Sequence, residues 1–135
     1  MSANSWAVEI AARTLCQEAR GEPPEGQSAV AHVLKNRLVS GRWGASLASV
    51  CLWPMQFSGW RGPQDSNFAY ACGLADDDAM LSKMRDVIAK ALARPDDPTQ
   101  GATHYYADTI GAPGWTEGAV CCGKFGHQLF YRNVK

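Results

Sequence analysis

Helix-breaking residues divide the N-terminal part of this chain into two helical segments and so restrict how it can fold. Residues 5–19 carry apolar side chains at helical spacing, and Gly21, Pro23 and Pro24 then prevent that helix from continuing. A second helical pattern follows at once over residues 25–39. Because the connection is short, we expect the two helices to pack as a hairpin, with the break exposed at one end.

The size and charge of the chain limit what it can be. Its 135 residues, 46% of them apolar, suit one compact domain spanning residues 1–135. Thirteen basic residues balance thirteen acidic ones, so the positive field that attracts nucleic acid is missing. The N-terminus lacks the basic and apolar regions of a signal peptide, and no apolar run approaches the roughly 20 residues that span a bilayer. We therefore expect synthesis in the cytoplasm and no stable membrane insertion.

The cysteines do not form a metal-binding pattern. None of the five belongs to a C-x-x-C pair, and two of them are adjacent in the sequence: Cys16, Cys51, Cys72, Cys121 and Cys122. In a reducing compartment such residues are mostly buried free thiols. We expect no metal and no cofactor.

The remainder of the chain has one strong helix and little regular sheet. Residues 40–62 are rich in Gly, Trp and Ser, and only residues 46–52 have a helical pattern there. Asp76 or Asp77 is expected to cap a long helix that ends near residue 93, since apolar residues recur along it at helical spacing.

Two short aromatic segments, residues 103–107 and 128–132, are typical of strands and are expected to form a small hairpin. Helices dominate the pattern, and no linker or repeat divides the chain. The expected fold class is therefore α+β, mainly α, in a single domain.

Glu18 is the residue best placed for acid chemistry. It lies in the last turn of the first predicted helix, where the helix dipole disfavours a carboxylate. Glu22 and Glu25 add negative charge nearby and favour the protonated form of Glu18, whereas Arg20 opposes that effect. The spacing alone leaves open whether Glu18 is an acid catalyst or an ordinary solvated glutamate.

Six blocks of sequence resemble the signature of the SleB/CwlJ-type cell wall hydrolases, a family named for spore-cortex-lytic enzymes. The blocks occur in the family's order along essentially the whole chain: Glu18-Ala-Arg-Gly-Glu22, Gly26-Gln27-Ser-Ala-Val-Ala, Asn36-Arg37, Gln56-Phe57-Ser58, Gly101-Ala102-Thr-His-Tyr105-Tyr106 and Gly126-His127-Gln-Leu-Phe130-Tyr131.

The resemblance implies a lysozyme-like fold, related to that of lytic transglycosylases, and cleavage of the glycan strands of peptidoglycan. Glu18 would be the acid/base of a reaction that gives 1,6-anhydro products. A hydrolytic muramidase or glucosaminidase is the alternative, and it needs a second carboxylate about 5–5.5 Å away if retaining or about 6.5–9.5 Å away if inverting. Glu22, Glu25 and Asp65 are candidates for that second group.

Seven residues in these blocks are candidates for binding the glycan: Glu22, Gln56, Phe57, Ser58, Tyr105, Tyr106 and His127. Gln56 and Ser58 could hold an acetamido group through hydrogen bonds. Tyr105 and Tyr106 point to opposite faces of a strand, so one of them packs inward and the other can reach the substrate. A histidine in the position of His127 is more often structural than catalytic.

Other residues near these blocks have less defined roles. Asn36 and Arg37 close the second helix and are expected to serve the scaffold. Four tryptophans lie in loops rich in Gly or Pro, and we expect one or two of them to contact glycan: Trp43, Trp53, Trp60 and Trp115.

Two rival functions stay open at this point. A cysteine peptidase or amidase would use Cys16 or Cys51 as nucleophile with His104 or His127 as base. An inert glycan-binding module would keep the aromatic loops without needing Glu18. For the enzyme, the missing signal peptide suggests a monomeric endolysin-like protein that acts on the cell wall, in the periplasm or outside the cell, after release by a holin-type partner.

Overall fold

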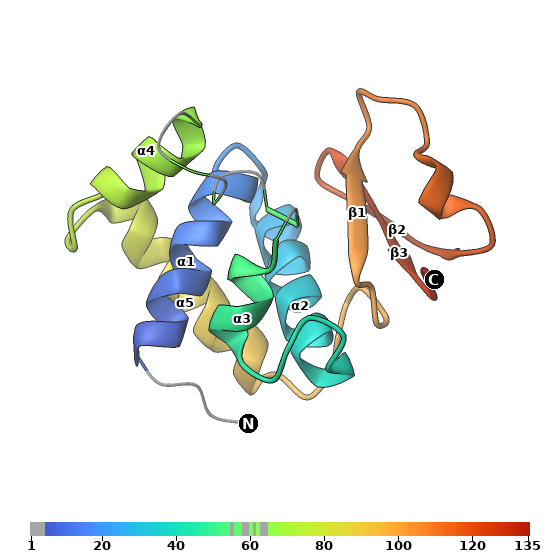
Figure 1. The fold of residues 1–135 in the computed structure, drawn as a ribbon, viewed down its shortest axis with the longest axis horizontal. Helices are drawn as coiled ribbons and strands as arrows, with labels where there is room; N and C mark the ends of the chain where they lie inside the picture. The colour runs from blue at the N-terminus through green and yellow to red at the C-terminus, as the bar shows by residue number, and fades with distance from the viewer. Residues whose placement is uncertain (1–4, 55, 58–59, 61, 63–64) are drawn as a thin grey trace.

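The fold has a helical half and a sheet half. We describe residues 5–54, 56, 57, 60, 62 and 65–135 of a computed structural model. Figure 1 shows the five α-helices together on one side and the strands on the other. In chain order the elements are α1 (Ser5–Ala19), α2 (Pro24–Ser40), α3 (Leu47–Leu52), α4 (Ser66–Gly73), α5 (Ala79–Ala93), β1 (His104–Ala107), the 3-10 helix η2 (Gly114–Thr116), β2 (Val120–Phe125) and β3 (Gln128–Arg132).

The predicted helix hairpin is confirmed. α1 ends at Ala19, and α2 begins with Pro24, where a missing backbone N–H costs no helical hydrogen bond. α2 ends at Gly41, which has a left-handed conformation and donates its N–H to the carbonyl of Leu38. The sequence pattern therefore located both ends of the break correctly.

The long helix α5 packs its apolar stripe against α1 and α2. Leu81, Met84 and Ile88 are buried, as the spacing predicts. The expected cap was wrong by one or two residues, because the side chain of Asp78, rather than that of Asp76 or Asp77, accepts a hydrogen bond from the N–H of Leu81. Asp78 directly precedes the first helical residue, and only there can the carboxylate reach the N–H three residues later.

The sheet has three strands, and the expected hairpin was therefore incomplete. β1 and β3 pair in antiparallel fashion as predicted, but β2 pairs with the other edge of β3, which gives the order β1-β3-β2. Sequence analysis missed β2 because Cys121, Cys122 and Gly123 do not alternate between apolar and polar. The pairing of β2 is also irregular there, with a register shift between Cys121 and Gly123.

Sequence analysis also missed the helix α4. Its N-terminus is capped by Asp65, whose side chain accepts a hydrogen bond from the N–H of Asn67. Only Ala71 of this helix is fully buried, so the sequence carries no clear apolar stripe. Within the described part of the chain, no helix has the length and hydropathy needed to cross a membrane.

All five cysteines are free thiols in the structure. Cys16 and Cys51 are buried in the core, as expected. Cys72 and Cys121 are exposed, however, and Cys122 is half-buried. The expectation of mostly buried thiols was thus wrong for the cysteines of α4 and β2, because these elements lie at the periphery of the fold.

Glu22 joins the two halves of the molecule. Its Oε1 accepts a hydrogen bond of 2.7 Å from the backbone N–H of His127, in the turn between β2 and β3. Its Oε2 lies 3.4 Å from Nδ1 of the same histidine. Gly126 allows this close approach, because an added Cβ would lie 2.6 Å from Oε1 of Glu22 and 2.9 Å from Cδ of Pro23. The break between α1 and α2 therefore holds the β2–β3 turn in place.

We expect Gly126→Ala to lower the free energy of unfolding by about 1–3 kcal/mol, through strain and displacement of Glu22. Gly126 has φ +62°, a conformation that alanine adopts only at a cost. Chemical denaturation measures the change. Gly111→Ala is the matched control, since no atom lies within 4 Å of the added Cβ and stability should stay within about 0.5 kcal/mol. Equal stability of the two variants would contradict the role of Glu22 as a link.

Candidate active site

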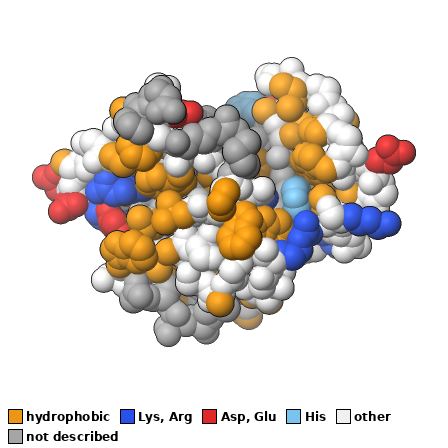
Figure 2. Space-filling view, viewed as in Figure 1, with side chains coloured by type: hydrophobic (Ala, Val, Ile, Leu, Met, Phe, Trp, Pro, Cys, Tyr) orange, Lys and Arg blue, Asp and Glu red, His pale blue; other side chains and the backbone are white. Residues whose placement is uncertain are grey.

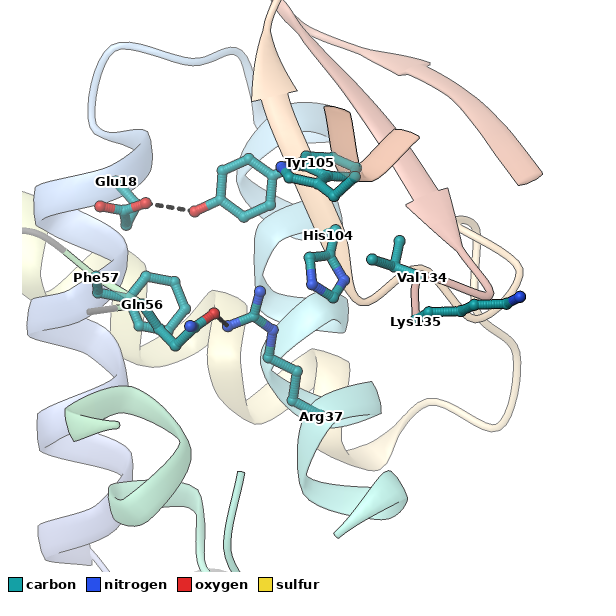
Figure 3. Close-up of a pocket in the computed structure, with 9 residues that line it drawn as sticks. Glu18, Arg37, Gln56, Phe57, His104, Tyr105, Val134 and Lys135 are labelled. Carbon is teal, nitrogen blue, oxygen red and sulfur yellow. Dashed lines mark hydrogen bonds between the residues drawn. The ribbon is translucent and has the colours of Figure 1, made fainter. Parts of the chain in front are cut away.

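A pocket of about 380 Å³ lies where the helices meet the sheet. Figure 3 shows Glu18 on one side of it, with Tyr105 and His104 entering from β1 and Arg37 rising from α2. The described residues that line the pocket are Glu18, Arg37, Gln56, Phe57, His104, Tyr105, Trp115, Val134 and Lys135. Residues from both ends of the sequence thus share one cavity.

The carboxyl of Glu18 is largely buried and accepts a hydrogen bond from one tyrosine. Its Oε1 accepts a hydrogen bond of 2.5 Å from the hydroxyl of Tyr105, drawn as a dashed line in Figure 3. Burial raises the pKa of Glu18 above its ordinary value, while the hydrogen bond from Tyr105 and the charge of Arg37 lower it and so limit the rise. Because burial raises its pKa, this carboxyl holds its proton more readily than an exposed glutamate does, which is what a general acid requires.

The two tyrosines of β1 lie on opposite faces, as the strand alternation predicts. Tyr105 points toward the helices, where its ring stacks on Phe130 with the ring centroids 5.3 Å apart. Tyr106 lies among the aromatic rings of the other face and stacks on Tyr131 at 5.8 Å. Tyr105 is therefore the tyrosine that reaches the pocket, although it packs inward, and Tyr106 does not line the cavity.

Arg37 serves the scaffold, as expected, but it is also part of the pocket wall, which the sequence did not indicate. Only 4% of the residue is exposed, yet its guanidinium lies in the cavity wall. Nε donates to the carbonyl of Thr103 at 2.7 Å and Nη1 donates to Oε1 of Gln56 at 3.1 Å. Burial lowers the pKa of Arg37 to about 10, so it stays charged at neutral pH. Asn36, in contrast, serves the scaffold by donating to Asp97 and to the carbonyl of Ala102.

His104 is a pocket residue that the sequence did not single out for the glycan site. Its ring lies between two tryptophans, with centroids 5.6 Å from Trp43 and 5.2 Å from Trp115. Burial lowers its pKa to about 4, and the charges of Arg37 and Arg42 add to the effect. The imidazole is therefore neutral at physiological pH. The available signal was its position one residue before Tyr105 in the same sequence block.

The tryptophans divide between pocket and core. Trp115 lines the pocket, whereas Trp43 is 4% exposed beside His104. Trp60 donates its indole N–H to the hydroxyl of Thr14, which favours a structural role. Trp53 is 41% exposed but does not line the cavity.

Two of the three residues in the Gln56-Phe57-Ser58 block can be placed. Gln56 lines the pocket and holds its side-chain carbonyl toward Arg37, as Figure 3 shows. Among the described residues, none accepts a hydrogen bond from its amide nitrogen. Phe57 also lines the pocket, but it is only 4% exposed and belongs to the hydrophobic core. Ser58 lies outside the described residues.

The other acidic candidates lie away from the pocket. Glu22 binds His127 in the β2–β3 turn, and neither residue lines the cavity. Glu25 is exposed in the first turn of α2, and Asp65 caps α4. Among the described residues of the wall, Glu18 therefore has the only acidic side chain. The residues outside the description contain no Asp or Glu in the sequence.

The described residues form a mainly helical domain with a small antiparallel sheet, and one partly buried acidic side chain lies in the pocket between the two parts. A fold and pocket of this kind are typical of an enzyme that uses a carboxylic acid. Comparison with known proteins identifies its family. Residues 21–131 match the model of the Cell Wall Hydrolase family, so the chain belongs to that family. The match begins just after Glu18.

Curated relatives agree with this family. The chain is 28% identical over 126 residues to a spore cortex-lytic enzyme of Halalkalibacterium halodurans, covering 91% of this chain and 34% of that protein. It is 29% identical over 114 residues to a spore cortex-lytic enzyme of Oceanobacillus iheyensis, covering 80% of this chain and 35% of that protein. The chain thus spans about a third of the length of these relatives.

Solved structures show the same fold. The catalytic domain of the germination-specific lytic transglycosylase SleB from Bacillus anthracis superimposes with a TM-score of 0.72 at 24% identity, over 96% of each chain. The catalytic domain of the Bacillus cereus SleB protein gives 0.75 at 23% identity, over 97% of this chain and 93% of that one. The predicted family and fold class are both confirmed.

We expect Tyr105→Phe to raise the pKa of Glu18 further, because the variant removes a hydrogen bond that stabilises the carboxylate. A pH titration followed by NMR of carboxyl-labelled glutamate measures the change. Tyr106→Phe removes the same hydroxyl on the opposite face of β1 and should leave the titration of Glu18 as in the wild type. A Glu18 pKa unchanged in Tyr105→Phe would show that the hydroxyl does not control this proton.

We expect Glu18→Gln to raise the melting temperature at pH 7, because it removes a carboxylate that burial destabilises. The pKa of Glu18 is higher in the folded chain than its ordinary value of 4.5, so wild-type stability falls as pH rises from 4.5 through the folded pKa. The advantage of the variant should therefore vanish as the pH is lowered to about 4.5. Glu117→Gln, at an exposed position, should show no such pH-dependent gain. Thermal melts at several pH values measure both; a constant difference would argue against burial as the cause.

Proposed function

We propose that this chain cleaves the glycan strands of peptidoglycan as a lytic transglycosylase, between N-acetylmuramic acid and N-acetylglucosamine. The observation that carries the proposal is the isolation of Glu18. It is a partly buried carboxyl with a raised pKa, and no second acidic side chain lines the described pocket. A transglycosylase needs one acid/base, whereas the usual glycoside hydrolase needs two carboxylates.

The proposed reaction uses the proton of Glu18 twice. Glu18 first protonates the bridging oxygen, and the bond from C1 of N-acetylmuramic acid to that oxygen breaks. The carboxylate that remains then removes the proton from the C6 hydroxyl of the same sugar, as O6 bonds to C1 and forms the 1,6-anhydro ring. Tyr105 stabilises the carboxylate between the two steps through its hydrogen bond. Glu18 ends protonated, and no water is consumed.

Three of the residues expected to bind glycan line the same cavity as Glu18. We propose that the free amide of Gln56 holds an acetamido oxygen, while Phe57 and Tyr105 form apolar wall against the sugar. Trp115 also lines this cavity and offers a further aromatic surface. Glycan contacts by Glu22, Ser58, Tyr106 and His127 stay predictions from the sequence.

The cysteine-based alternative has weaker support. Cys16 and Cys51 are both fully buried, and burial raises the pKa of Cys16 to about 11 and that of Cys51 to about 12. Such thiols stay protonated at neutral pH and are poor nucleophiles. Neither lines the pocket that holds His104.

The names of the relatives support peptidoglycan as the substrate, but they do not show from which source that peptidoglycan comes. They are named spore cortex-lytic enzymes, and cortex is a form of peptidoglycan, which supports glycan cleavage as the function of this chain. The endolysin-like release through a holin-type partner and the monomeric state stay predictions from the sequence.

The experiment that tests the proposal is mass spectrometry of the products released from purified peptidoglycan. The wild type should release muropeptides lighter by one water than the hydrolytic products. Glu18→Gln keeps the shape of the side chain but has no transferable proton, so we expect at least a 100-fold loss of product, the order of magnitude that general acid–base catalysis supplies. Glu117→Gln is the control for removal of a glutamate and should retain activity.

Other products would identify the alternatives. Reducing-end sugars would mean a hydrolase and a second catalytic group, and cleaved stem peptides would mean an amidase or peptidase. Glycan binding without cleavage by the wild type would favour an inert module. Equal activity of the wild type and Glu18→Gln would refute the assignment of Glu18.

A further inference from the structure

Three basic side chains lie in or beside the pocket wall: Arg37 lies inside, where its charge also acts on Glu18, and Lys135 and Arg42 lie toward the outer side. Figure 3 shows Arg37 between Gln56 and His104, and Lys135 on the outer side of the cavity, with its amine directed away from Glu18. Arg42 does not itself line the pocket but lies next to it, since its Nη1 donates to the carbonyl of the pocket residue Val134 at 2.7 Å. Its guanidinium also lies 4.6 Å from the ring centre of Trp43. Figure 2 shows basic side chains beside a histidine on this face of the molecule.

These three positive charges lack acidic partners. In the described part of the chain, no carboxylate lies within the 4.0 Å of an ion pair from Arg37, Arg42 or Lys135. Most other arginines of the fold, such as Arg13, Arg85 and Arg94, do pair with carboxylates. Arg37 is nearly buried, and a buried charge without an ionic partner is costly to the folded state. The field of these residues reaches the pocket wall, because Arg37 and Arg42 both lower the pKa of His104.

Arg37, Arg42 and Lys135 are here called the basic rim. A positively charged rim without acidic partners favours binding of an anionic group of the substrate. The sugar rings of peptidoglycan and their acetamido groups are uncharged. The negative charges of the polymer lie on the lactyl substituent of muramic acid and on the peptide that extends from it, and all of them are carboxylates. Guanidinium and ammonium groups bind carboxylates through charge-assisted hydrogen bonds.

We propose that the outer end of the pocket binds a carboxylate of the lactyl-peptide substituent of muramic acid, with Arg42 and Lys135 as its ligands. The inference rests on the proposed function, since it concerns the same pocket. Both residues are exposed, and Arg42 keeps N–H groups beyond the one that it donates to Val134, whereas Arg37 is held by Thr103 and Gln56 and supplies background charge. The arrangement keeps the bound carboxylate at the far end from Glu18, where it does not disturb the proton of the acid.

The proposal is tested by removing charges from the protein and from the substrate in one set of experiments. Two double variants are compared. Arg42→Gln with Lys135→Gln removes both charges, whereas Arg42→Lys with Lys135→Arg keeps the charges but changes the shapes of the side chains. Lys83→Gln is the control for loss of one positive charge, because Lys83 is exposed on α5 and does not line the pocket. The substrates are glycan with intact peptides, the same glycan with its carboxylates converted to amides, and amidase-treated glycan that carries a free lactyl carboxylate.

We expect the double Gln variant to lose about tenfold in kcat/KM on glycan with intact peptides, mainly through KM, as loss of charge-assisted hydrogen bonds predicts. On the amidated glycan its kcat/KM should stay within about twofold of the wild type, since the partner charge is gone. The charge-preserving variant and Lys83→Gln should resemble the wild type on every substrate. Loss on amidase-treated glycan as well would place the lactyl carboxylate at the rim, and loss confined to intact peptides would place a peptide carboxylate there.

An equal loss of kcat/KM on charged and amidated glycan would overturn the proposal. It would mean that the rim supports the structure of the pocket but does not recognise the charge of the substrate. No loss on any substrate would overturn it too. Calorimetric binding of a soluble disaccharide-peptide, with Glu18→Gln as the background, keeps the test independent of catalysis. If the wild type cleaves nothing, the proposed function fails, whereas weaker binding on removal of Arg42 and Lys135 charges would still support the rim as a carboxylate site.

Discussion

The active pocket depends on how the sheet is held against the helix hairpin. Three polar side chains of the helical half bridge the two parts: Glu22 accepts from the N–H of His127, Arg37 donates to the carbonyl of Thr103, and Glu18 accepts from Tyr105. Such contacts are directional, so they fix the position of β1 more narrowly than apolar packing alone could. The cavity is the space that remains between these bridges.

Two of these bridging side chains are costly to the folded state because their charges are buried. The proposed reaction accounts for that cost. Burial raises the pKa of Glu18 and lowers that of Arg37, which means that the fold destabilises the charged form of both. An apolar pair would hold the halves together at lower cost. Instead, the fold places a carboxyl with a raised pKa in the same pocket as a guanidinium that has no ionic partner among the described residues. This arrangement fits the proposed acid/base reaction on a substrate that also carries an anion.

Sequence reasoning succeeded where a pattern is local. The helical period and the breaks at Gly21 and Pro24 fixed α1 and α2, and the blocks of the family brought Glu18 and Gln56 to attention. It failed for β2, where a bulge interrupts the strand, and for α4, which buries little. It also assigned Arg37 to the scaffold, because a cation at a helix C-terminus has an ordinary explanation that needs no pocket.

The sequence by itself thus determined the helix hairpin, the family and an acidic residue at the break, since all of these depend on neighbours along the chain. Tertiary structure alone decided which groups share a cavity with that acid. Tyr105 lies 87 positions from Glu18, and Arg37 meets Gln56 across 19. A pKa is set by desolvation and by charges close in space, so neither the environment of Glu18 nor the basic rim formed with Arg42 and Lys135 could follow from spacing in the sequence.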